Sequence, residues 1–92
     1  MEQNTVREIT ICDSSLAPDI RAGQKLRYDT DAELQKDDFV VVFMQRRLAV
    51  GRLLRHDTYE IVLALPRNST DATSFNYRSD NVEAVAKVVE VV

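Results

Sequence analysis

A run of six apolar residues from Phe39 to Met44 constrains the fold of this chain more than any other stretch. It consists of aromatic, β-branched and other apolar residues, and it predicts a strand. Because the run is apolar on both faces, we expect this strand to lie in the centre of a sheet. A hairpin turn is predicted at residues 45–47. This turn lacks the Asn-Gly or Asp-Gly pair usual in two-residue loops, so a loop of three or four residues is the alternative.

Residues 48–55 are predicted as the returning strand of this hairpin. Side chains alternate across a strand, which gives it two faces, one with Leu48, Val50 and Arg52 and the other with Ala49, Gly51 and Leu53. A glycine in mid-strand weakens a sheet and often marks a bulge or the close approach of another segment. Gly51 is therefore expected at such a place.

Other runs of β-branched and aromatic residues, separated by turns at close spacing, predict an all-β domain. We expect six or seven short, mainly antiparallel strands in a single domain spanning residues 1–92, which is long enough for one modest core. The polar and acidic residues 30–38 are predicted as a loop or one turn of helix. The predicted strands are residues 6–12, 25–29, 39–44, 48–55, 59–65, a short edge strand at 75–77, and 82–92.

The stretch from Cys12 to Gly23, between the first two predicted strands, carries the candidate chemistry. Ser15 precedes Pro18 by three residues, and Gly23 follows Pro18 by five. Proline excludes a helix interior and a regular central strand here, so Ser15 is predicted on a turn or at the start of a short helix. The stretch resembles the Ser-Met-x-Pro-x-Ile-x-x-Gly-Asp element in the C-terminal domains of LexA and phage repressors, the self-cleaving relatives of signal peptidase.

This resemblance covers the chain from Ile9 to Val92, including the central hairpin, residues 63–68 and the terminal strand. It places Ser15 in the position of the family's nucleophile. The sequence departs from the family pattern at two sites near the serine. Asp13-Ser14 stands where the family usually has Gly-Asp, and Gln24 replaces the aspartate after the glycine.

The resemblance also implies a lysine that acts as the base, because a serine hydroxyl is not ionised near neutral pH. The family places this lysine in a segment reading roughly Thr-Val-Lys-Arg-Leu, which matches residues 48–53, and Gly51 occupies the lysine position. Arg52 cannot replace the lysine, because a guanidinium does not deprotonate and its side chain points to the opposite face of the strand. None of the lysines present, Lys25, Lys36 and Lys87, matches the family position. We therefore expect no active catalytic residue, with Ser15 as a vestigial nucleophile position and Gly51 as the lost base position.

Composition narrows the remaining functions. Fifteen acidic and 12 basic residues give a net charge of −3. This charge argues against a domain that binds nucleic acid through its own surface. Cys12 is the only cysteine, which excludes a disulfide framework or a cysteine metal cluster, and we expect it to be a small buried residue at a strand end. His56, the only histidine, is expected on an exposed turn. No apolar signal region or run of about 20 apolar residues is present, so we expect a cytoplasmic protein without a membrane segment, metal or cofactor.

Three interpretations remain open. The first is the dimerisation and regulatory domain of a phage-type or SOS-type transcriptional repressor that no longer cleaves itself. Such a domain would be a homodimer and would reach DNA only through an N-terminal helix-turn-helix domain, which this chain lacks. The resemblance implies an antirepressor or a RecA-type protein as a further partner. The apolar terminal strand and the pair Phe75 and Tyr77 are candidates for the dimer contact, with core or edge positions as the alternative.

The second interpretation is an active Ser–Lys peptidase that uses a base outside the family's position. Lysine serves as a base only where burial or a nearby cation lowers its pKa. The third interpretation is an unrelated small β domain in which Ser14 and Ser15 only shape a turn through hydrogen bonds to the backbone.

Overall fold

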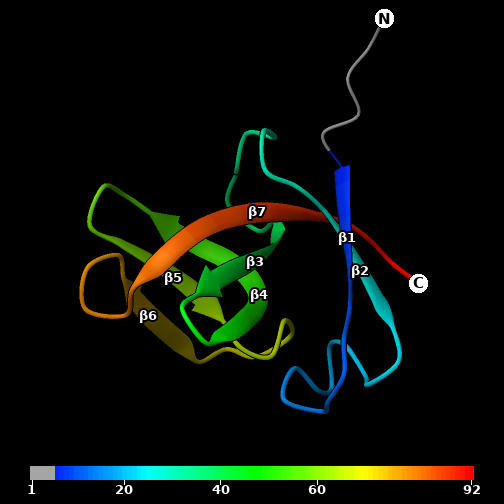
Figure 1. The fold of residues 1–92 in the computed structure, drawn as a ribbon. Helices are drawn as coiled ribbons and strands as arrows, with labels where there is room; N and C mark the ends of the chain where they lie inside the picture. The colour runs from blue at the N-terminus through cyan, green and yellow to red at the C-terminus, as the bar shows by residue number, and fades with distance from the viewer. Residues whose placement is uncertain (1–5) are drawn as a thin grey trace, which may run out of the picture.

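A computed structural model describes residues 6–92, and within this range the chain forms seven strands and no helix. All strand pairs are antiparallel, and they form one sheet in the order β1-β2-β7-β3-β4-β5-β6 (Figure 1). The predicted all-β, antiparallel fold is confirmed. The strands are β1 (Val6–Thr10), β2 (Lys25–Asp29), β3 (Phe39–Met44), β4 (Arg47–His56), β5 (Glu60–Ala64), β6 (Ala72–Asn76) and β7 (Val82–Val91).

β7 joins the two halves of the sheet. Strands β3 to β6 follow one another as neighbours, whereas β7 returns across the molecule and lies between β2 and β3 (Figure 1). Its first half pairs with β3, as in Val42 opposite Val85, and its last residues pair with β2, as in Leu26 opposite Val91. The long terminal strand predicted from residues 82–92 therefore joins the β1-β2 part of the sheet to the β3-to-β6 part.

The hairpin between β3 and β4 is tighter than one of the predicted alternatives. Met44 pairs with Arg47, so the loop contains only Gln45 and Arg46, and the three-residue or four-residue loop is wrong. The register of β3 against β4 is uninterrupted from Phe39 to Met44. Apolar residues on both faces of these strands fix that register, because a slip by one residue would exchange the two faces.

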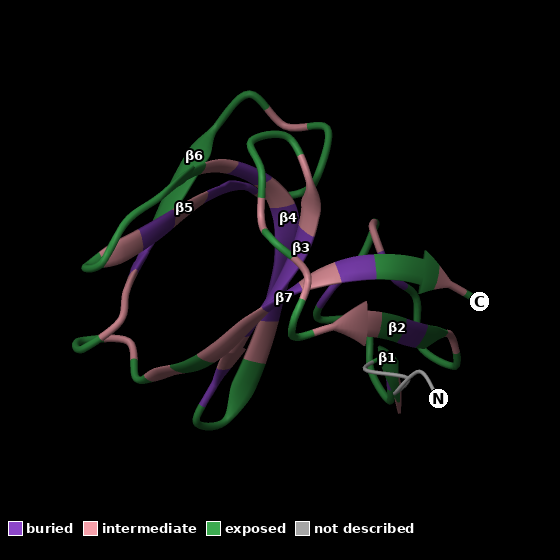
Figure 2. Cartoon of the chain, turned by 90° about the horizontal axis from the view of Figure 1, so that it is seen from above, coloured by how far each residue is buried: buried purple, intermediate pink, exposed green. Residues whose placement is uncertain are grey.

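Two hydrophobic clusters cover opposite faces of the central strands, where buried residues gather in Figure 2. Neighbouring residues of β3 and β4 alternate between the clusters, as the sequence predicted for residues 48–53. The first cluster is built from Ile11, Leu16, Ile20, Leu26, Val41, Val50, Ala86 and Val88. The second is built from Val40, Val42, Met44, Ala49, Leu53, Ile61, Leu63 and Phe75.

Cys12 is exposed, so the predicted burial of its side chain is wrong. β1 ends at Thr10, and Ile11 is the residue that enters the core, with 5% of its surface exposed. The amide of Ile11 donates to the carbonyl of Gln24, and the carbonyl of Ile11 accepts from the amide of Gly23. These bonds fix Ile11 pointing inward, and the next side chain consequently points to solvent.

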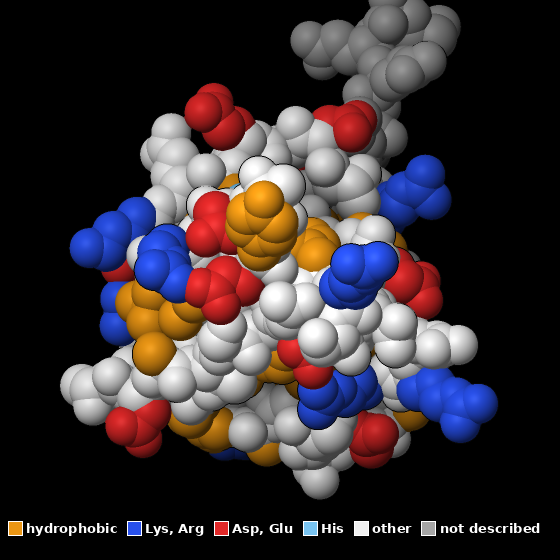
Figure 3. Space-filling view, turned by 90° about the vertical axis from the view of Figure 1, so that its left-hand side faces the viewer, with side chains coloured by type: hydrophobic (Ala, Val, Ile, Leu, Met, Phe, Trp, Pro, Cys, Tyr) orange, Lys and Arg blue, Asp and Glu red, His pale blue; other side chains and the backbone are white. Residues whose placement is uncertain are grey.

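The molecular surface carries charges of both signs. On the face shown in Figure 3, Lys and Arg side chains lie among Asp and Glu side chains and form no continuous basic field. His56 is exposed, as expected, but it is the last residue of β4 and not part of the turn that follows, and its Nε2 contacts the hydroxyl of Tyr77. Residues 6–92 contain no helix long and apolar enough to cross a membrane.

Candidate functional site

Ser15 lies on a turn that is anchored to the first hydrophobic cluster. Leu16 and Ile20 enter that cluster, with 8% and 0% of their surfaces exposed. The amide of Ala17 donates to the carbonyl of Ser14, and the amide of Ile20 donates to the carbonyl of Leu16. The turn predicted for Ser15 is therefore present, and the alternative of a short helix is not.

The Ser15 hydroxyl donates a hydrogen bond of 2.6 Å to Oδ1 of Asp13, and the Ser15 amide donates to the same oxygen at 3.0 Å. The side-chain bond from Ser15, followed by the backbone bond, lowers the pKa of Asp13 below its ordinary value of 3.8. A carboxylate with a lowered pKa is a weaker base than an ordinary one. Asp13 therefore orients the Ser15 hydroxyl and is poorly suited to take its proton.

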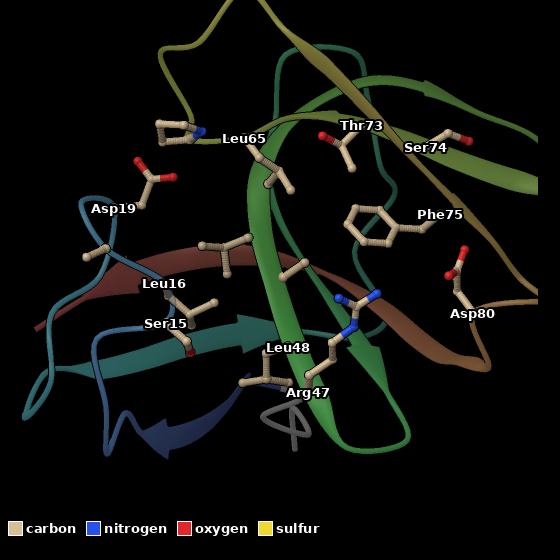
Figure 4. A pocket seen from close by; sticks show the side chains of 14 residues that line it. Ser15, Leu16, Asp19, Arg47, Leu48, Leu65, Thr73, Ser74, Phe75 and Asp80 are labelled. Atoms are coloured by element: carbon tan, nitrogen blue, oxygen red, sulfur yellow. The ribbon is translucent and has the colours of Figure 1, made fainter.

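Ser15 borders a cleft between the serine turn, the start of β4 and the edge strand β6 (Figure 4). Residues 47–50 of β4 and residues 73–75 of β6 line opposite sides of it. In Figure 4 the side chains of Leu16, Leu65 and Phe75 point into the cleft, and the guanidinium of Arg47 reaches toward the Phe75 ring. The distance from Arg47 Cζ to the centroid of that ring is 5.9 Å.

Gly51 does not line this cleft, and the structure leaves no space beside it for a side chain. A Cβ atom at Gly51 would lie 2.3 Å from the carbonyl oxygen of Ala64 and 2.5 Å from Cδ2 of Leu65. A glycine in the position of the family's lysine predicts an empty space where the lysine side chain would have been, and this prediction is wrong. The predicted close approach of another segment at Gly51 is confirmed, and that segment is the end of β5.

None of the three lysines lines the cleft beside Ser15. The Nζ atom of Lys25 is 3.8 Å from a carboxylate oxygen of Glu8, and the Nζ atom of Lys87 is 4.0 Å from Asp38. Neither residue lines the cleft beside Ser15, and Lys36 does not line it either. Among residues 6–92, the hydrogen bonds of Ser15 go to Asp13 and not to an amine.

Arg47 is a residue of the cleft that the sequence did not single out. The only signal in the sequence is its place beside Arg46 at the end of the hairpin. Whether such an arginine faces a cleft depends on β6, which is more than 20 residues further along the chain. Phe75, predicted as a dimer contact or a core or edge residue, is buried in β6 and also lines the cleft.

Within residues 6–92 no group of three or more His, Cys, Asp or Glu side chains is arranged to hold a metal ion. No family model, no curated protein and no solved structure matches this chain.

Proposed function

We propose that this chain is the dimerisation and regulatory domain of a phage-type or SOS-type transcriptional repressor, working in the cytoplasm without cleaving itself. The observation that carries the proposal is the state of the serine turn. Ser15 occupies a turn at the border of a cleft, but its hydroxyl is bonded to Asp13, and β5 fills the space beside Gly51. A domain retained for association has no need of a base at this position.

The end of β7 supports association between two copies. β7 pairs with β3 only as far as Lys87, so on that side the residues after Lys87 have no neighbouring strand among residues 6–92. Val89 and Val92 are 47% and 56% exposed there. A two-fold contact uses the same patch on both copies, and an open strand edge with exposed apolar residues suits such a contact.

Sedimentation of the 92-residue chain at tens of micromolar tests the proposal. We expect a dimer that Val89→Glu converts largely to monomer, because this change buries two carboxylates at a two-fold contact. Tyr59→Glu is the matched control, since Tyr59 is 76% exposed and lies in the turn before β5. A chain that sediments only as a monomer, or a dimer that Tyr59→Glu disrupts and Val89→Glu does not, contradicts the proposal.

A further inference from the structure

The loop between β5 and β6 borders the cleft beside Ser15. Residues 66–71 of this loop, which we call the strap, are exposed apart from the half-buried Ser69. The Ser69 amide donates to the Pro66 carbonyl inside the strap. Within residues 6–92, no backbone-to-backbone hydrogen bond joins the strap to another segment. Side chains from other elements therefore hold the strap in place.

Three side chains from outside the strap contact it. The Asp19 carboxylate of the serine turn accepts a hydrogen bond of 2.7 Å from the Arg67 amide. The Arg67 guanidinium lies over the ring of Phe39 in β3, with 4.6 Å between Cζ and the ring centroid, which is within the range of a cation–π contact. Arg52 of β4 donates to the carbonyls of Arg67 and Ser69 at 3.3 and 3.5 Å.

Of these strap contacts, the bond to Asp19 is the one that crosses the cleft. Asp19 lines the cleft from the serine turn and Pro66 lines it from the strap. In Figure 4 the Asp19 carboxylate points from the serine turn toward the loop that follows β5. Leu16 and Ile20 anchor the serine turn in the first cluster, whereas Leu65, just before the strap, packs on the second. The bond therefore connects parts of the molecule that are built on opposite faces of the sheet.

The strap is the partner in this bond that can move. The serine turn is fixed by two core side chains, and the strap is exposed and has no backbone bond to a neighbouring segment. Segments with few buried contacts open locally at far lower cost than core strands. Loss of the Asp19 bond would release the strap from the serine turn, while β5 and β6 stay paired at its two ends through Ala64 and Ala72.

We propose that the strap opens and closes one end of the cleft, with the hydrogen bond between the Asp19 carboxylate and the Arg67 amide as its latch. In the closed form, present in this structure, Asp19 holds Arg67 against the serine turn. In the open form the strap pivots about the ends of β5 and β6, and Val50, which lines the cleft, becomes accessible to molecules in solution. This movement controls access to the cleft, is independent of the β7 contact, and goes beyond the proposed function.

Thiol labelling of the full chain tests the latch. Cys12, the only cysteine, is replaced in Cys12→Ser, and Val50→Cys then places a thiol where the native side chain is 3% exposed. The rate of reaction with a neutral dithiodipyridine reagent reports how often this position opens. Asp19→Ala should raise the rate at least about tenfold, the effect of losing one hydrogen bond to a charged group. If Val50→Cys does not unfold cooperatively in urea, Leu48→Cys, which also lines the cleft, takes its place.

Three comparisons separate the latch from a general loss of stability. Asp80→Ala is the matched control, because Asp80 also lines the cleft and accepts a 2.7 Å bond from a backbone amide, that of Asn76, on its own side of the cleft. It should leave the rate at residue 50 within about twofold, a difference of less than half of the tenfold step of 1.4 kcal/mol. A thiol introduced by Val88→Cys, at a buried position outside the cleft, should be labelled at the same rate with and without Asp19→Ala. Asp19→Asn should give a rate between those of the parent and of Asp19→Ala, because an amide oxygen accepts the same bond without the charge.

Faster labelling at residue 50 alone, partly reversed by Asp19→Asn, supports the latch. Four results would overturn it. Asp19→Ala could leave the rate at residue 50 unchanged, Asp80→Ala could raise it equally, or Asp19→Asn could be no slower than Asp19→Ala. The fourth is equal acceleration at residues 50 and 88, which would mean that the whole domain loosens and that the strap does not open by itself.

Discussion

At the scale of single residues, Asp13 is the hydrogen-bond partner of Ser15. Asp13 accepts hydrogen bonds from both the hydroxyl and the amide of Ser15, and no lysine among residues 6–92 lines the cleft beside it. Both of these bonds lie within a local turn. The consequences for folding and for pH dependence can be measured separately.

Ser15→Ala should change the free energy of unfolding by less than about 0.5 kcal/mol, as for most exposed positions. The amide bond to Asp13 remains in this variant, and only the hydroxyl bond is lost. Urea denaturation of both proteins at pH 7 measures the difference, and sedimentation should show unchanged association. A large loss of stability would mean that the hydroxyl holds more of the structure than this turn.

The same substitution should raise the pKa of the Asp13 carboxyl toward its ordinary value, because the hydroxyl bond is the largest cause of its lowering. A carboxyl with a lowered folded-state pKa stabilises the fold above its unfolded pKa, and this contribution is lost as the pH falls through the folded value. Any deficit of Ser15→Ala should therefore be present near neutral pH and disappear in acid. Carboxyl NMR titration checks the shift, and an unchanged Asp13 pKa would contradict the bonding described here.

Gly51→Lys should not restore cleavage. The first carbon of any side chain at this position would collide with the backbone of Ala64, which cannot move aside like the end of a flexible side chain. Gly51→Ala isolates this effect and should cost about 1–3 kcal/mol, the usual range for overpacking. Thermal denaturation of the alanine variant measures it. If Gly51→Ala is as stable as the parent chain, the backbone of β5 moves aside at little cost. In that case a side chain fits at residue 51, and the absence of cleavage by Gly51→Lys would need another reason.

At the scale of elements, the strands with clear turn residues on both sides were predicted best. β2 and β3 have the predicted bounds because turn residues flank them, although both also pair with the distant strand β7. β6 begins three residues before the predicted edge strand, since its Ala72-Thr73-Ser74 portion has no apolar periodicity and pairs with β5 along its backbone. Backbone pairing of this kind does not require particular side chains, so the sequence does not reveal it.

The candidate site was predicted less completely than the strands. The serine turn followed from Pro18 and the β-branched run before it, but the surroundings of Ser15 depend on long-range packing. The space at Gly51 is filled because β5 ends against it, and the hydrogen bond that Asp19 accepts from the Arg67 amide depends on where the loop after β5 lies. Neither fact follows from the neighbouring sequence alone.

Arg52 links β4 to two loops, so replacing it should lower the free energy of unfolding. Its guanidinium donates to Asp37 at 2.7 Å and to the carbonyls of Arg67 and Ser69 at 3.3 and 3.5 Å. Arg52→Met should cost about 1 kcal/mol, since its ion pair is partly screened by solvent. Arg55→Met is the control, because the ion pair of Arg55 within residues 6–92 is with Glu60 and its side chain is 64% exposed. Equal losses in urea denaturation would show that the loop contacts contribute nothing.

At the scale of the whole molecule, we expect the proposed domain to associate with protein and not with nucleic acid. Nothing in residues 6–92 forms a helix that would enter a DNA groove, and the sheet has an open backbone edge at the end of β7. The charged side chains in Figure 3 are mixed in sign. DNA recognition by proteins draws most of its non-specific affinity from neutralised phosphates, which requires a basic surface.

The 92-residue chain should therefore bind duplex DNA negligibly at about 0.15 M salt, because its net charge of −3 repels the phosphate backbone. Fluorescence anisotropy of a labelled duplex, with the chain at up to tens of micromolar, measures this. Replacing the hairpin arginines in Arg46→Gln/Arg47→Gln should leave the signal unchanged, since these residues would be the first to hold phosphates if the hairpin touched DNA. A dissociation constant below about 1 μM that rises steeply with salt and is weakened by the double substitution would identify the hairpin as a DNA contact. That result would contradict a domain that reaches DNA only through a separate N-terminal part.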